Sequence, residues 1–120
     1  MLEPIPNLAD NVVGFSAKGR VSAEDYETTL MPAIEAQVKA HGKVRLLYQL
    51  GPEFEGYTPG AMWDDARLGL AHWSAWEKVA VVSDVEWIRT AIRFFAFALP
   101  GKMKVFPNEE FAAAKEWVQS

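Results

Sequence analysis

The chain has 120 residues, half of them hydrophobic and 23% charged, and this composition predicts one globular domain over residues 1–120 rather than a disordered chain. With 12 basic and 16 acidic residues the net charge is −4, which argues against a nucleic-acid-binding protein because such proteins need a clustered basic surface. Cysteine is absent, which excludes disulfides and thiolate metal sites.

The first 42 residues predict a hairpin followed by a helix. Apolar residues alternate over 2–6 and 13–17, a pattern typical of two paired antiparallel strands. Ser22 and Asp25 have the spacing of a capping box, which predicts that a helix begins there. Pro32 is expected to kink or interrupt that helix, because proline has no N–H to donate.

The middle of the chain predicts a strand, a loop and a long helix. Residues 43–50 alternate as a strand does, with Leu47 adding apolar surface to the second face. The proline- and glycine-containing segment 51–60 is expected to be a loop, and loops of this length are often functional. Helical spacing then continues from residue 61 to about Trp76.

Two further strand–helix units complete the chain. The β-branched run 79–82 predicts a strand covered on both faces, followed by a helix over 84–99. A short strand at 103–106 and a final helix from Asn108 follow. The order β-β-α-β-α-β-α-β-α predicts an α/β fold: a mostly parallel sheet with one antiparallel edge strand and packed helices.

Within this order, four stretches carry a recognisable pattern: residues 19–26, the Trp63-Asp64-Asp65 run, residues 79–84 with Trp87, and residues 113–117. Together they resemble the SpoIIAA-like (STAS-like) family of small, uncharacterised bacterial proteins. The resemblance implies a STAS-type fold, related in architecture to the CRAL-TRIO lipid-binding fold. It implies no particular activity.

The same resemblance raises the question of a phosphorylation site. STAS-type antagonists carry a phosphorylated Ser where the second helix begins, which corresponds to residues 51–61 of this chain. That segment contains no Ser, so Thr58 is the one candidate, at a helix N-terminus where a phosphate would be favoured.

Two sets of residues are candidates for ligand binding. Asp84 and Trp87 follow the strand 79–82, and ligands of α/β proteins collect beyond the carboxyl ends of parallel strands. The helix that begins at residue 61 contributes Trp63, Asp65 and His72. The alternative reading makes Asp84 a cap, Trp87 a core residue and His72 a surface residue.

No motif for catalysis, a metal or a cofactor is present. Asp64 and Asp65 point about 100° apart on a helix, so they form no acid–base pair unaided, and an Asp64–Arg67 ion pair is the alternative. We therefore expect no cofactor and lean against an enzyme. An enzyme that uses Asp64, Asp65, His72 or Asp84 remains open.

The chain is unusually rich in aromatic residues, with five Trp, three Tyr and seven Phe. Trp76 and Phe97 are the rings that one small core is least expected to absorb, and together with Phe94 they form the predicted interface. They favour a regulatory module that self-associates as a homodimer through an aromatic interface. An apolar ligand pocket between helices, or an aromatic-rich core, are the alternatives.

The N-terminal residues and the length of the apolar runs bear on cellular location. Residues 1–6 lack the basic and apolar regions of a signal peptide, and the longest apolar run, residues 94–99, is far below the roughly 20 residues that span a bilayer. We expect a cytoplasmic protein without a membrane span.

Overall fold

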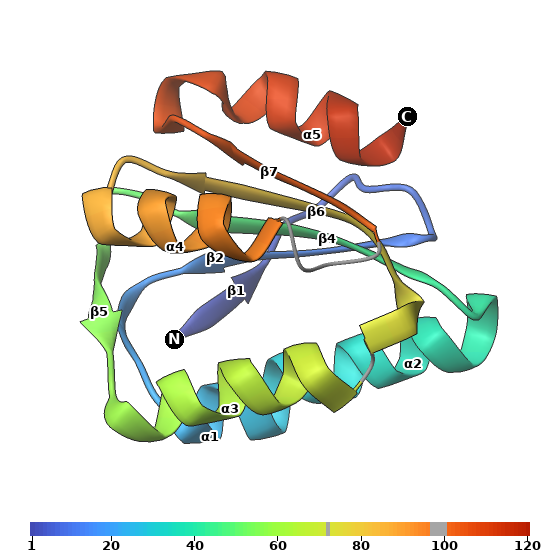
Figure 1. Cartoon of the computed structure of the whole chain (residues 1–120), viewed down its shortest axis with the longest axis horizontal. Coiled ribbons are helices and arrows are strands. Elements are labelled where there is room, and N and C mark those ends of the chain that lie inside the picture. The colour runs from blue at the N-terminus through green and yellow to red at the C-terminus, as the bar shows by residue number, and fades with distance from the viewer. Residues whose placement is uncertain (72, 97–100) are drawn as a thin grey trace.

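The computed structural model describes residues 1–71, 73–96 and 101–120, and its centre is a five-stranded sheet in the order β1-β2-β4-β6-β7 (Figure 1). The strands are β1 (Leu2–Pro4), β2 (Val12–Ala17), β4 (Val44–Leu50), β6 (Trp76–Ser83) and β7 (Lys102–Phe106). β1 runs antiparallel to β2, and all other neighbours are parallel. The predicted α/β fold, with its antiparallel edge strand, is confirmed.

A second, two-stranded sheet includes part of the segment that the sequence predicts as a loop. β3 (Gly19–Val21) pairs in parallel with β5 (Phe54–Tyr57). The prediction of an uninterrupted loop over 51–60 is therefore wrong. Local patterns could not show this strand, because its pairing partner lies far earlier in the chain.

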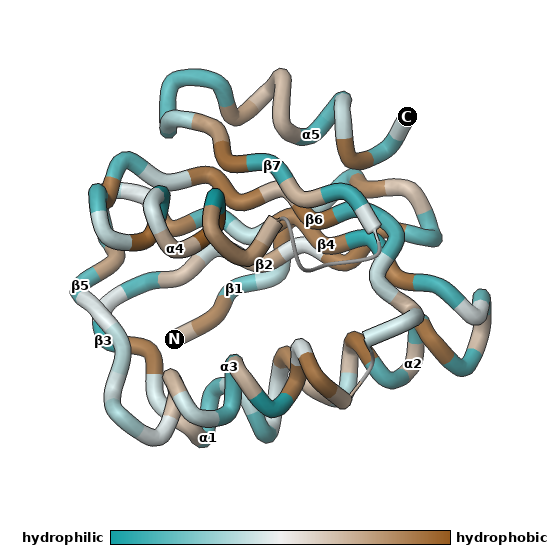
Figure 2. The backbone as a smooth tube through the Cα atoms, viewed as in Figure 1, coloured by the Kyte–Doolittle hydropathy of each residue, from teal (hydrophilic) through white to brown (hydrophobic). Residues whose placement is uncertain are grey.

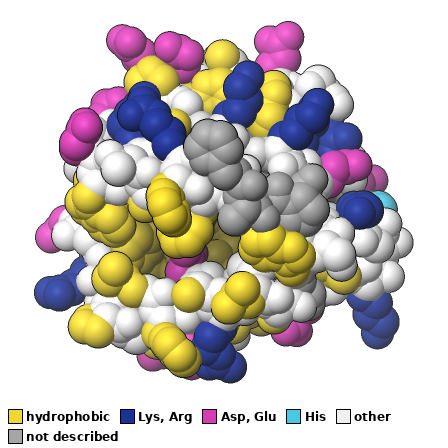
Figure 3. Space-filling view, in the orientation of Figure 1, with side chains coloured by type: hydrophobic (Ala, Val, Ile, Leu, Met, Phe, Trp, Pro, Cys, Tyr) yellow, Lys and Arg dark blue, Asp and Glu magenta, His cyan; other side chains and the backbone are white. Residues whose placement is uncertain are grey.

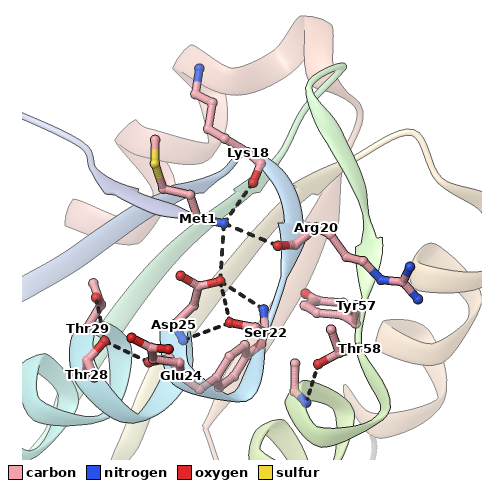
Figure 4. A network of polar contacts seen from close by, with 12 residues as sticks. Met1, Lys18, Arg20, Ser22, Glu24, Asp25, Thr28, Thr29, Tyr57 and Thr58 are labelled. Atoms are coloured by element: carbon pink, nitrogen blue, oxygen red, sulfur yellow. Dashed lines mark hydrogen bonds and ion pairs between the residues drawn. The ribbon is translucent and has the colours of Figure 1, made fainter.

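The first helical segment begins at the predicted capping box (Figure 4). The Ser22 backbone N–H donates to the Asp25 carboxylate at 2.8 Å, and the Asp25 backbone N–H donates to Ser22 Oγ at 3.3 Å. A π-helical turn that ends two residues before Pro32 interrupts the α-helix, in line with the expected interruption. The segment consists of α1 (Ala23–Asp25), the π-helical turn η1 (Tyr26–Leu30) and α2 (Met31–His41).

The remaining helical elements are α3 (Pro59–Ala71), η2 (Trp73–Ala75), α4 (Glu86–Ala96), η3 (Asn108–Glu110) and α5 (Phe111–Gln119). Among the described helices, α5 covers one face of the sheet, and α1 to α4 lie on the other (Figure 1). None of the helices in the described ranges is long and apolar enough to cross a membrane.

β4 divides the interior into two hydrophobic cores. Leu46, Tyr48 and Leu50 face the larger core under α1 to α4, whereas Leu47 faces the smaller core under α5. Figure 2 shows hydrophobic residues along the central strands and at intervals along the helices that pack on them. The predicted two-sided burial of this strand is confirmed, and the candidate site opens on the side of the larger core.

Candidate functional site

A pocket of about 520 Å³ opens between α3, α4 and the face of the sheet opposite α5. Its volume lies within the roughly 300–1,000 Å³ typical of small-molecule sites. Figure 3 shows the hollow, with hydrophobic side chains around it and an acidic side chain inside it. The sheet supplies a floor that includes Leu46, Val79 and Val81.

Small residues on the two helical walls leave this space open. α3 presents Ala66 and Gly69 to the pocket, and α4 presents Ala91. A methyl group added at Gly69 would meet no heavy atom within 4 Å. Because α3 packs on α1 and η1 rather than on α4, neither helix fills the gap.

Aromatic rings border the pocket. Trp73, Trp87 and Phe95 line it, and each is at least 40% exposed to solvent. The rings of Tyr57 and Trp87 meet edge to face, with their centroids 6.3 Å apart. Large apolar rings at an opening are typical of a surface that a ligand or partner covers.

One end of the pocket is polar. Four residues from four elements meet there through their side-chain oxygens, and we call them the Tyr–Asp cluster: Tyr26 (η1), Tyr48 (β4), Tyr57 (β5) and Asp65 (α3). Tyr26 Oη lies 2.7 Å from Asp65 Oδ1 and 3.1 Å from Tyr48 Oη. Tyr57 Oη lies 3.2 Å from Tyr48 Oη.

The hydrogen bonds of this cluster have a defined direction. Each phenol has one hydrogen, and Tyr26 donates its hydrogen to the Asp65 carboxylate. Tyr48 must therefore donate to Tyr26, and Tyr57 donates to Tyr48. The chain runs from Tyr57 through Tyr48 and Tyr26 to Asp65, and it uses all three phenol hydrogens.

The protein environment shifts the acid–base properties of the cluster. Burial raises the pKa of Asp65 above its usual value, and the hydrogen bond from Tyr26 opposes this shift. The carboxylate is accessible through the pocket opening, yet the surrounding protein displaces much of its water. Burial also raises the pKa of Tyr57 to about 12, so the phenol remains protonated at neutral pH.

The pocket's side chains suit a small organic molecule better than a metal ion. Within the described ranges, no three His, Asp or Glu side chains come together as metal ligands. The pocket offers one carboxylate and otherwise apolar or phenolic surface.

Comparison with known proteins decides the family. A model of the SpoIIAA-like family matches residues 12–119, which is most of the chain. The chain belongs to the SpoIIAA-like family. The expected resemblance is thereby confirmed.

A solved structure supports the same fold. It is an uncharacterised protein of the DUF3478 family from Shewanella loihica PV-4, with a SpoIIAA-like fold. The match has a TM-score of 0.77 and 28% sequence identity, and it covers 98% of this chain and 92% of that chain. No curated protein sequence matches the chain.

In this SpoIIAA-like domain the pocket brings together two of the four predicted ligand-binding residues that the structure describes, Asp65 and Trp87. Trp63 is 67% exposed and does not line the pocket. Asp84 is exposed outside the pocket, where its carboxylate accepts a hydrogen bond from the Asn108 backbone N–H at 3.1 Å. His72 lies outside the described residues, as does Phe97 of the predicted interface.

The expectation that Trp76 stays outside the core is wrong. α3 ends at Ala71, and Trp76 begins β6 instead of ending a helix. The indole is 6% exposed, and its Nε1–H donates to the Gly69 carbonyl at 3.2 Å. A ring buried in this way is unavailable for an interface.

The two adjacent aspartates diverge as predicted. Asp64 is 2% exposed and its carboxylate pairs with the Arg67 guanidinium at 3.4 Å, whereas Asp65 lines the pocket. Thr58 has a structural role, because its Oγ1 accepts the Ala61 backbone N–H at 3.1 Å at the start of α3. Phosphorylation of Thr58 remains a prediction.

No sequence motif marks the three tyrosines of the cluster as site residues. One signal was available: Tyr48 occupies a buried position of an apolar strand, and a buried phenol usually finds a hydrogen-bond partner. Nothing in the local sequence identifies Tyr26, Tyr57 and Asp65 as the groups that complete the chain of hydrogen bonds.

Proposed function

We propose that this SpoIIAA-like protein is a non-catalytic binding module whose pocket holds a small, mostly apolar ligand. The observation that carries the proposal is the 520 Å³ pocket with an apolar floor, aromatic borders and one polar end. Filling it removes apolar surface from water, which stabilises a complex by about 25 cal/mol for each Å².

The polar end supports binding better than catalysis. In the described part of the pocket, the one carboxylate accepts a hydrogen bond from a phenol that is itself tied into a chain. The described lining residues include no Ser, Thr, Cys, Lys or His to act as the usual nucleophile or base. The cluster is suited to orienting a ligand within the pocket.

The test is to fill the pocket from within. Ala91→Trp places an indole in the space, and Thr90→Trp adds the same ring at the adjacent, exposed position. We expect Ala91→Trp to weaken binding of the fluorescent apolar probe N-phenyl-1-naphthylamine roughly tenfold or more, and Thr90→Trp to change it by less than about twofold. Fluorescence titration measures both. A wild-type protein without saturable binding, or two variants that bind alike, contradicts the proposal.

Self-association is a second candidate, supported by the exposed Phe94 of α4, which does not line the pocket. Phe94 is 74% exposed, and its ring lies edge to face at 5.6 Å from that of Phe95 at the pocket border. We propose that this part of α4 forms a homodimer contact. Sedimentation equilibrium is expected to show a dimer that Phe94→Glu converts to a monomer, whereas a strict wild-type monomer at high concentration rules the contact out.

A further inference from the structure

The Asp65 carboxylate has spare capacity to accept hydrogen bonds. Tyr26 donates to Oδ1, and among the described residues no group donates to Oδ2. No Lys or Arg of the described chain lies within ion-pair distance of it. A carboxylate in a pocket without a cationic partner is a site for a cation or a strong donor.

The phenols cannot supply the missing donor. The three hydrogens of the Tyr–Asp cluster are used within the chain from Tyr57 to Asp65. Rotating one phenol toward a ligand would break a bond inside the cluster. The polar end therefore presents acceptors only, and the matching ligand group must donate.

The charge of the pocket also favours a donor or cationic ligand group. No Lys or Arg is among its described lining residues, and Asp65 is its one acidic side chain. A ligand carboxylate or phosphate would face Asp65 as a like charge, which is unfavourable. The pocket thus disfavours fatty acids and other anionic amphiphiles.

Aromatic rings near the cluster also favour a cation. Tyr57 belongs to the cluster and to the pocket wall, and its ring meets that of Trp87. The electron-rich faces of such rings attract ammonium groups. A carboxylate and electron-rich rings together form a suitable environment for a protonated amine.

We propose that the ligand is a cationic amphiphile, with a protonated amine bound to Asp65 and an apolar body on the floor formed by Leu46, Val79 and Val81. This assignment rests on the proposed function, since it names the ligand class of the same pocket. The amine donates to Oδ2, and the apolar body fills the space between α3 and α4.

Three probes that differ in their head group test this assignment. Isothermal titration calorimetry at neutral pH compares octylamine, 1-octanol and octanoate on the wild-type protein. We expect octylamine to bind roughly tenfold or more tightly than octanol, because it gains a charge-assisted hydrogen bond, and octanoate to bind most weakly. Octylamine that binds no more tightly than octanol overturns the assignment.

A matched pair of variants locates the effect. Asp65→Asn removes the charge from the pocket and keeps the side-chain shape, and Asp84→Asn makes the same change outside it. We expect Asp65→Asn to weaken octylamine binding roughly tenfold and octanol binding by less than about threefold, and Asp84→Asn to change neither. Unchanged octylamine binding by Asp65→Asn also overturns the assignment.

The outcomes separate the two proposals. If none of the three probes binds the wild-type protein, the pocket is not a ligand site and the proposed function fails. If octanol binds and Ala91→Trp blocks it, but octanoate binds as well as octylamine, the ligand site stands and only the amine assignment fails.

Discussion

Replacing Trp76 with Ala is expected to lower the free energy of unfolding by about 3–5 kcal/mol, the range for truncating a large buried aromatic residue. The indole is 6% exposed, packs in the larger core and donates from Nε1 to the Gly69 carbonyl. Truncation removes the packing and leaves that carbonyl without its side-chain donor. Urea denaturation followed by circular dichroism measures the loss.

Trp63→Ala is the matched control, because its ring is 67% exposed and lies outside the pocket. Alanine is a good helix former, so we expect this change to cost less than about 1 kcal/mol. A stability loss for Trp76→Ala no larger than that for Trp63→Ala would contradict the burial of the Trp76 ring. A loss that appears only on dilution would instead indicate an interface role for Trp76.

Replacing Tyr26 with Phe is expected to lower the free energy of unfolding by about 1–3 kcal/mol. Tyr26 is fully buried, and its hydroxyl both donates to Asp65 and accepts from Tyr48. The change leaves the Tyr48 hydrogen without an acceptor and removes the one described hydrogen bond to the carboxylate.

Tyr57→Phe provides the comparison, because Tyr57 lies at the donor end of the chain. Its loss leaves no buried hydrogen without an acceptor, so we expect a smaller cost than for Tyr26→Phe. Equal costs for the two variants would show that the hydrogen-bond chain does not have the assigned direction.

The pH dependence of stability gives a second measure of Tyr26→Phe. The hydrogen bond from Tyr26 lowers the pKa of Asp65, so its removal raises that pKa further. A carboxyl whose folded-state pKa is raised stabilises the fold when protonated, and this stability is lost as pH rises from the unfolded-state pKa through the folded-state pKa. Compared with the wild-type protein, we expect the Tyr26→Phe variant to lose more free energy of unfolding as pH rises, over a window that extends to higher pH. NMR follows the titration of Asp65. A lower Asp65 pKa in the variant contradicts this.

The order of the five strands of the central sheet and of the helices between them followed from the sequence, whereas β3 and β5 were not predicted. Period-two alternation over 43–50 and the β-branched run 79–82 place two central strands, and both faces of β4 are buried as predicted. The capping box at Ser22 marks the first helix start. These features depend on neighbours a few residues apart, which is why a sequence pattern reveals them.

The ends of strands that depend on pairing with a distant strand were less predictable. Helical spacing extends to Trp76, yet β6 takes this residue because it pairs beside Val44, with a register shift before Arg45. β5 forms because β3 offers a parallel partner. In both places a contact between distant segments outweighs the local preference.

The sequence by itself determined the α/β architecture, the family resemblance and the candidacy of Asp65 and Trp87. Only the tertiary structure produced the pocket and the Tyr–Asp cluster. Tyr26 and Asp65 are 39 positions apart, and they meet because η1 and α3 pack side by side over the sheet. The space between α3 and α4 likewise exists because small residues face each other across it, a property of two helices together and of neither alone.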